Sequence, residues 1–155
     1  MNKLKPDKKR FIIAGFAGTV TVLAVTIAIY ATFFHELLGQ FTELSDETIT
    51  LISRDPVNVP LMVLANLAHG FLIAVVIQWG KFFTTIQGAK AAAVVAFLTE
   101  VYFCFSQYAI LKTMSLVSAV ADTCMWTFIN LFVGAVVALI LRNPSEAREQ
   151  KTSDT

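Results

Sequence analysis

Long apolar runs alternate with short polar segments along this chain. Residues 11–34 carry no charged side chain, and further apolar runs cover about 59–79, 89–111 and 116–141. A helix needs about 20 apolar residues to cross about 30 Å of hydrocarbon. The pattern therefore predicts four transmembrane helices. The first run exceeds the roughly 7 to 15 apolar residues of a secretory signal, so we expect it to stay as an anchor.

The polar segments divide the chain into a basic head (1–10), a membrane domain (11–142) and a polar tail (143–155). Within the membrane domain, the loop at 35–58 carries five acidic residues against the single Arg54. We expect a solvated loop whose leucines dip into the membrane surface. A vestibule that attracts cations and a surface that docks a partner are the alternatives.

Basic residues beside the spans predict the orientation, because Lys and Arg flanks stay in the cytoplasm. One side of the predicted membrane domain carries ten of them: Lys3, Lys5, Lys8, Lys9, Arg10, Lys81, Lys90, Arg142, Arg148 and Lys151. The other side carries Arg54 and Lys112. The pattern thus predicts an all-α, multi-pass protein with both termini cytoplasmic. The short connections after the second and third spans favour an up-down-up-down bundle.

Composition agrees with this class. Hydrophobic residues make up 56% of the 155 and charged residues only 15%, with a mean hydropathy of +0.68. Soluble domains average about 25% charged residues, so a water-soluble globule is excluded and the lipid bilayer is the expected partner. A formal net charge of +1 provides no basic field for nucleic acid, which we therefore exclude as a partner.

Six ionisable or amide side chains lie inside the predicted spans, away from the span ends: Asn66, His69, Glu100, Gln107, Asp122 and Asn130. An acidic residue at the bilayer centre costs about 2.5 to 3.5 kcal/mol, so such residues usually face the bundle interior. A rise of about 1.5 Å per residue places Glu100 about 16 Å deep and most of the others in the outer half. Their depth thus predicts a cluster nearer the outer face.

Spacing puts these residues on one face of each helix. Asn66 and His69 lie three residues apart, Glu100 and Gln107 seven, and Trp126 lies four from both Asp122 and Asn130. Turning the three faces inward predicts a polar pocket that opens outward. Its predicted residues are Asn66, His69, Glu100, Gln107, Asp122 and Trp126, with His35 and Glu36 at the mouth. The sequence allows His69 to pair with either Glu100 or Asp122.

Three interpretations of these residues remain open. The pocket binds or conducts a small polar ligand, a cation or a proton. Alternatively, the polar residues are interhelical hydrogen bonds in an accessory or scaffold subunit. Thirdly, the protein is a membrane redox or haem-binding component. We expect a non-enzymatic protein without cofactor or metal, because His35 and His69 differ in depth and no zinc-binding spacing occurs.

Small residues and cysteines have simpler interpretations. Ala14 with Gly18, and Gly134 with Ala138, predict close helix packing within the chain, with a homo-oligomer face or a membrane-protein partner as the alternative. Cys104 and Cys124 are expected to behave as small hydrophobic residues rather than as a disulfide.

The fourth span carries a family resemblance. Ala121-Asp122, Trp126 and Gly134-Ala135 within an apolar run resemble the last helix of small bacterial four-helix membrane proteins of uncharacterised function. The resemblance covers the last third of the chain. It implies a four-span bundle in a bacterial inner membrane, with Asp122 as the matching polar position, and it implies no catalytic residue.

Overall fold

Four long helices make up the described chain in a computed structural model, which describes residues 8–29, 56, 58–111 and 114–142. They are α1 (Lys8–Ile29), α4 (Val59–Gly80), α5 (Thr85–Ile110) and α6 (Leu116–Leu141). Each is long and apolar enough to cross a membrane. The predicted all-helical, four-helix class is therefore confirmed. Nearly all of the acidic loop, including His35 and Glu36, lies outside the described residues, as do most of the head and all of the tail.

Polar side chains mark where the helices begin. Asn58 accepts a hydrogen bond from the Leu61 N–H at 3.2 Å, and Pro60 lies in the first turn of α4. Thr84 starts α5 by accepting from the Gln87 N–H at 3.2 Å. Helix α5 therefore begins at Thr85, four residues before the expected start of its span.

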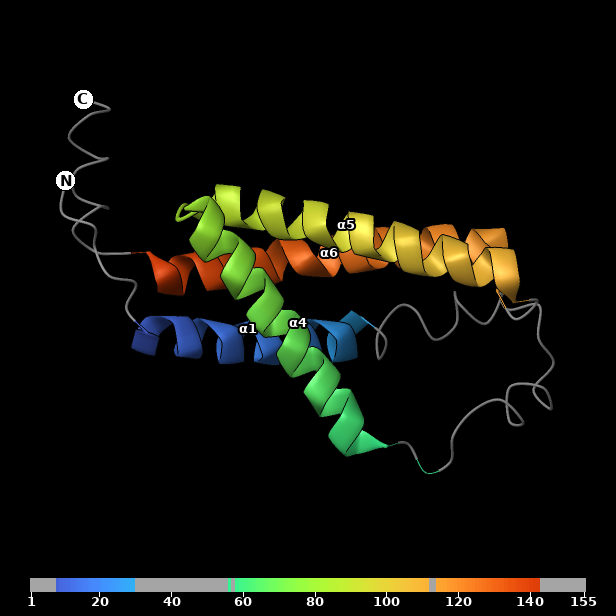
Figure 1. Ribbon diagram of the computed structural model, residues 1–155, viewed down its shortest axis with the longest axis horizontal. Helices are drawn as coiled ribbons and strands as arrows, with labels where there is room; N and C mark the ends of the chain where they lie inside the picture. Colours follow the sequence, from blue (N-terminus) through green and yellow to red (C-terminus); the bar gives the residue numbers. More distant parts are fainter. Residues whose placement is uncertain (1–7, 30–55, 57, 112–113, 143–155) are drawn as a thin grey trace.

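Helix α4 ends in a tight turn. Lys81 adopts a left-handed backbone with a φ of 56°, and the Phe82 N–H donates to the Ile77 carbonyl at 3.0 Å. Only Lys81 to Thr84 separate α4 from α5. The two helices thus connect directly, and the turn lies at the same end of the bundle as the start of α1 and the end of α6 (Figure 1).

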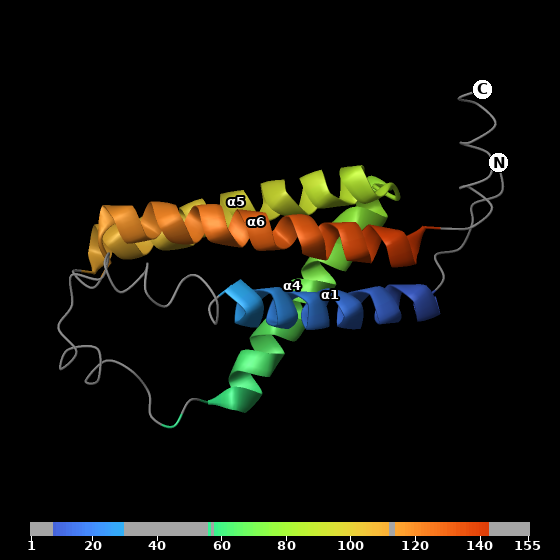
Figure 2. The same cartoon turned by 180° about the vertical axis from the view of Figure 1, so that it is seen from behind.

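Helices α4 and α6 are central, because each of them contacts the other three helices. Helix α5 lies along α6 over its length, whereas α4 crosses the bundle at a steep angle (Figures 1 and 2). Within the described residues, α1 and α5 make no contact with each other. The Arg10 guanidinium donates to the Arg142 carbonyl at 3.1 Å, which ties the start of α1 to the end of α6.

Two halves of the bundle differ in packing, so we name them separately. The terminal half, nearest Arg10 and Arg142, comprises residues 8–19, 70–80, 85–96 and 130–141. The distal half comprises residues 20–29, 59–69, 97–110 and 116–129. Most of the buried side chains lie in the terminal half. In α4 no residue before Gly70 is buried, and residues 58–65 are all exposed.

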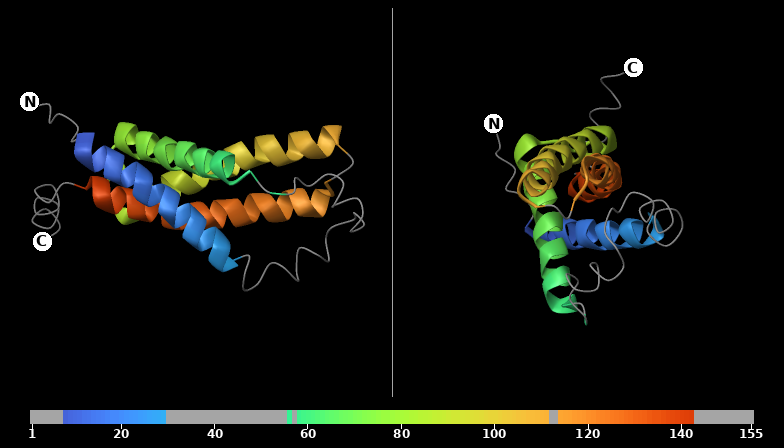
Figure 3. Two further views of the ribbon diagram at one scale, coloured as in Figure 1. Left: turned by 90° about the horizontal axis from the view of Figure 1, so that it is seen from below. Right: turned by 90° about the vertical axis from the view of Figure 1, so that its right-hand side faces the viewer.

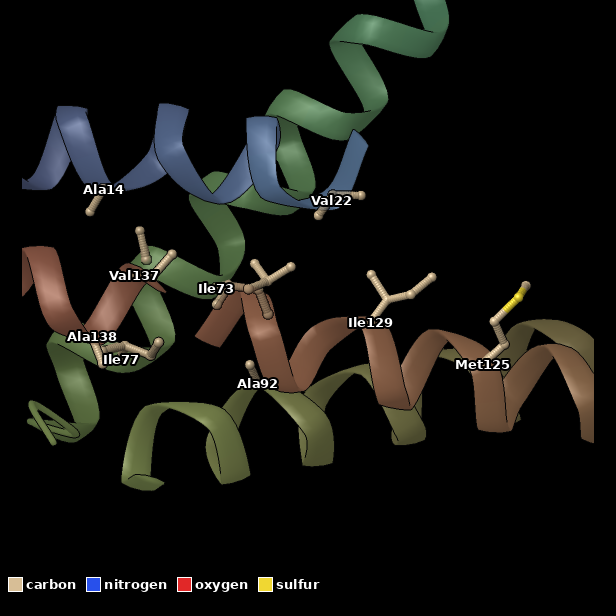
Figure 4. Close-up of a cluster of buried hydrophobic side chains, with 11 residues drawn as sticks. Ala14, Val22, Ile73, Ile77, Ala92, Met125, Ile129, Val137 and Ala138 are labelled. Carbon is tan, nitrogen blue, oxygen red and sulfur yellow. The ribbon is translucent and has the colours of Figure 1, made fainter. Parts of the chain in front are cut away.

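The hydrophobic core lies between α1, α4, α5 and α6. Figure 4 shows Ala14 and Val22 of α1 pointing toward side chains of α6, with Ile73 of α4 between the helices. Ile73 and Ile77 are completely buried. The first half of α4 lies away from this core, and Figure 3 shows it projecting from α5 and α6.

Glycines permit the closest contacts. A Cβ added to Gly70 of α4 would lie 2.6 Å from the Gly15 carbonyl oxygen and 2.7 Å from the Thr19 nitrogen, both in α1. On α5 and α6, Gly88 and Gly134 lie backbone to backbone in the same way. Close approach of this kind stabilises helix pairs in lipid, where hydrophobicity does not drive association.

The predicted packing role of the small-residue pairs is confirmed. Ala14, Gly18, Gly134 and Ala138 are all buried inside the single chain. They are consequently occupied by contacts between its own helices.

Candidate functional site

The polar residues of α4 and α6 meet where the two halves join. His69 Nε2 lies 2.8 Å from Asn130 Oδ1, and the Asn130 Nδ2 donates to the Trp126 carbonyl at 2.9 Å. The His69 and Trp126 rings pack edge to face with centroids 6.1 Å apart. Asn130 is completely buried, while His69 and Trp126 are half-buried. These three residues form a polar link between α4 and α6, which we call the His69 link.

A second polar group lies between α5 and α6 in the distal half. The Cys104 thiol donates to the Glu100 carboxyl at 3.4 Å and lies within hydrogen-bonding range of Thr123 on α6. Asp122 of α6 lies close enough to Glu100 to act on it electrostatically. Both carboxyls are half-buried. We call Glu100, Cys104, Asp122 and Thr123 the Glu100 cluster.

The two polar groups lie near each other. Glu100 is within electrostatic range of His69 as well as of Asp122. In the described part of the chain, however, no ion pair joins His69 to either carboxyl, and its Nε2 is hydrogen-bonded to Asn130 instead. Of the two pairings that the sequence left open, neither is made.

Asn66 and Gln107 stand apart from these groups. The Asn66 amide donates to the Met62 carbonyl of its own helix at 2.8 Å. Its backbone carbonyl, rather than its side chain, joins the neighbouring helix by accepting from the Thr19 hydroxyl at 3.3 Å. Gln107 is half-buried on α5. The predicted residues that come together are thus His69, Trp126, Glu100 and Asp122.

Two residues outside the predicted set belong to the site. Asn130 shares the helix face of Asp122 and Trp126, and its two four-residue steps were the signal that could have placed it there. Cys104 lies four residues after Glu100, which is the spacing of helical neighbours. Both cysteines are free, and the buried Cys104 is a hydrogen-bond donor as well as a small hydrophobic residue.

Threonines add hydroxyls that are mostly satisfied by their own helices. Thr123 donates to the Ala119 carbonyl at 2.8 Å and Thr127 to the Thr123 carbonyl at 2.7 Å. Such bonds to a preceding turn keep a hydroxyl satisfied without a partner helix. They do not define a site by themselves.

The donor set is chemically simple. Across the described residues, no three His, Cys, Asp or Glu side chains gather as metal ligands. No basic side chain lies in the span portions around the two groups, since the described Lys and Arg residues are near the helix ends at the terminal side. Two carboxyls and an imidazole without a Lys or Arg partner are suited to holding a positive charge.

Comparison with known proteins assigns the chain to no family. No protein-family model, curated protein or solved structure matches the chain. The four apolar helices are compatible with an integral membrane protein, and a more specific role depends on the two polar groups.

Proposed function

We propose that this chain is a non-enzymatic, multi-pass protein of a bacterial inner membrane whose polar groups bind or conduct a proton, a cation or a small polar ligand. The observation that carries the proposal is that Glu100 on α5 lies within electrostatic range of both Asp122 on α6 and His69 on α4. Ionisable residues inside a membrane are expensive, so their gathering favours a functional role.

The proposed arrangement is an up-down-up-down bundle with both termini in the cytoplasm. The bond from Arg10 to the Arg142 carbonyl supports it by holding the two ends of the membrane domain together. The basic flanks then lie on the cytoplasmic side. With this orientation, the distal half faces outward, and the Glu100 cluster becomes accessible from outside.

Flux through liposomes tests the proposal. The purified protein is reconstituted into liposomes with an internal pH dye, and proton entry is recorded under a K⁺ diffusion potential. A second set of vesicles with a Na⁺ dye tests cation entry. We expect entry of one of these ions above the rate of empty liposomes, and a return to that background in Glu100→Gln and Asp122→Asn.

The control for these variants is Glu149→Gln, which makes the same carboxyl-to-amide change in the polar tail. It should leave the flux unchanged. Background flux of both ions in the native chain, together with unchanged tryptophan fluorescence on adding Na⁺ or acid, would contradict the proposal. A reporter fused to the C-terminus tests the orientation, and an external reporter would rule the proposed topology out.

The second candidate is an accessory or scaffold subunit in which the polar residues only join helices. The bond between His69 and Asn130 favours it, because both atoms are paired without any ligand. Under this function, substitutions of His69 lower stability while those of Glu100 and Asp122 change neither flux nor fluorescence. A homo-oligomer or another membrane protein would then be the partner.

A further inference from the structure

Asn130 uses both ends of its side-chain amide. The Nδ2 group donates to the Trp126 carbonyl of the preceding turn at 2.9 Å, and Oδ1 lies 2.8 Å from His69 Nε2. The residue is completely buried, so no solvent competes for either end. The orientation of this amide therefore determines what it presents to His69.

The Trp126 carbonyl dictates that orientation. A carbonyl oxygen only accepts hydrogen bonds, so the amide end that faces it must be the NH₂ group. The reversed amide would place two acceptor oxygens against each other inside the bundle, which leaves the Asn130 side-chain oxygen without a donor. Asn130 Oδ1 consequently faces His69, and the hydrogen between them belongs to His69 Nε2.

We infer that Asn130 is a positioning residue that holds neutral His69 in its Nε2–H form and so makes Nδ1 the ring nitrogen that takes up a proton. In neutral imidazole one nitrogen donates and the other accepts, so a hydrogen fixed on Nε2 leaves the lone pair on Nδ1. Nε2 donates in the neutral and in the protonated ring alike. The link between α4 and α6 therefore persists when His69 gains a proton.

Glu100 of α5 is an ionisable group within electrostatic range of His69. Asp122 of α6 and Cys104 of α5 lie within range of Glu100 in turn. Helix α1 contributes no ionisable side chain between residues 11 and 29, and α4 contributes no other between 59 and 80. The use of this proton rests on the proposed function, whereas the position of the hydrogen on Nε2 does not.

Nitrogen NMR of the histidine rings tests the inference. The full-length protein with labelled histidine is measured in lipid at a pH where the ring is neutral, and the His69 signals are identified by their loss in His69→Gln. We expect a protonated Nε2 and an unprotonated Nδ1 as a single form. On acidification Nδ1 should gain its hydrogen while the Nε2 signal stays that of a protonated nitrogen.

Variants separate positioning from packing. Asn130→Leu should replace the single form by a mixture of the two tautomers, whereas Asn130→Asp, which keeps an acceptor oxygen opposite His69, should restore the Nε2–H form. Asn66→Leu is the matched control, since that amide bonds only within its own helix, and it should leave His69 unchanged. If Asn130→Leu does not fold, the native chain and Asn130→Asp still decide.

Two results would overturn the inference: a hydrogen on Nδ1 of neutral His69 in the native chain, or a single Nε2–H form retained in folded Asn130→Leu. A fixed Nε2–H form together with background ion flux would refute the proposed function alone. Loss of both the fixed form and the flux in Asn130→Leu, with both restored in Asn130→Asp, would support the two together.

Discussion

The terminal and distal halves of this bundle are built from similarly apolar sequences and pack very differently. Helix α4 shows the contrast within one element, because Ile73 is completely buried while Leu64 is 60% exposed. Glycines at the contacts explain the tight half, since their backbones approach neighbouring helices directly. The polar groups lie at the boundary and in the looser half. Thus the region that supports the fold and the region that offers chemistry are largely separate.

The largest expected difference comes from truncating one apolar residue in each half. Ile73→Ala should lower the free energy of unfolding by about 2 to 5 kcal/mol, because it leaves a cavity between helices. Leu64→Ala, on the same helix but exposed, should change it by less than about 0.5 kcal/mol. Unfolding in mixed micelles with rising SDS measures both. Equal losses would show that the distal half of α4 is packed after all.

Enlarging a helix contact should have the next largest effect. Gly70→Val should cost about 1 to 3 kcal/mol, because the new side chain meets backbone atoms of α1 that cannot move aside alone. Ala68→Val, two residues earlier and exposed, is the matched control. The same SDS titration compares them. If Gly70→Val left the free energy of unfolding unchanged, α1 and α4 could move apart without loss of stability.

The smallest expected effect is the coupling within the His69 link. A double-mutant cycle of His69→Phe and Asn130→Leu should give an interaction energy of about 0.6 to 2 kcal/mol, the range for hydrogen bonds between membrane helices. The control cycle pairs His69→Phe with Asn66→Leu and should give no coupling. Additive losses in the first cycle would show that the bond between His69 and Asn130 does not stabilise the bundle.

The helices were predictable because hydrophobic length and capping are local properties. Asn58 caps α4 where the sequence placed a cap, and Leu116–Leu141 has the bounds of its apolar run. Thr84 shows the limit of that approach, since its capping side chain starts α5 in a stretch that does not look apolar enough to be membrane-embedded. Helix starts depend on hydrogen bonds, whereas predicted spans depend on hydropathy.

The site was predictable only in part. Spacing placed Asp122, Trp126 and Asn130 on one face, and it placed Glu100 on another helix at a compatible depth. It could not show that Asn66 bonds back to its own helix or that His69 bonds with Asn130. Spacing gives the face of a residue on its own helix, while a partner depends on how two helices are rotated and how closely they approach.

The sequence by itself determined the membrane class, the four spans and the rarity of ionisable residues within them, because the cost of polar groups in lipid acts on each segment independently. Only the tertiary structure decided which polar residues meet. Apart from these few polar positions, the spans are apolar on every side, so hydrophobicity does not orient one helix against another. Close glycine contacts orient them instead, and through them His69 meets Asn130 while Glu100 and Asp122 come within range of each other.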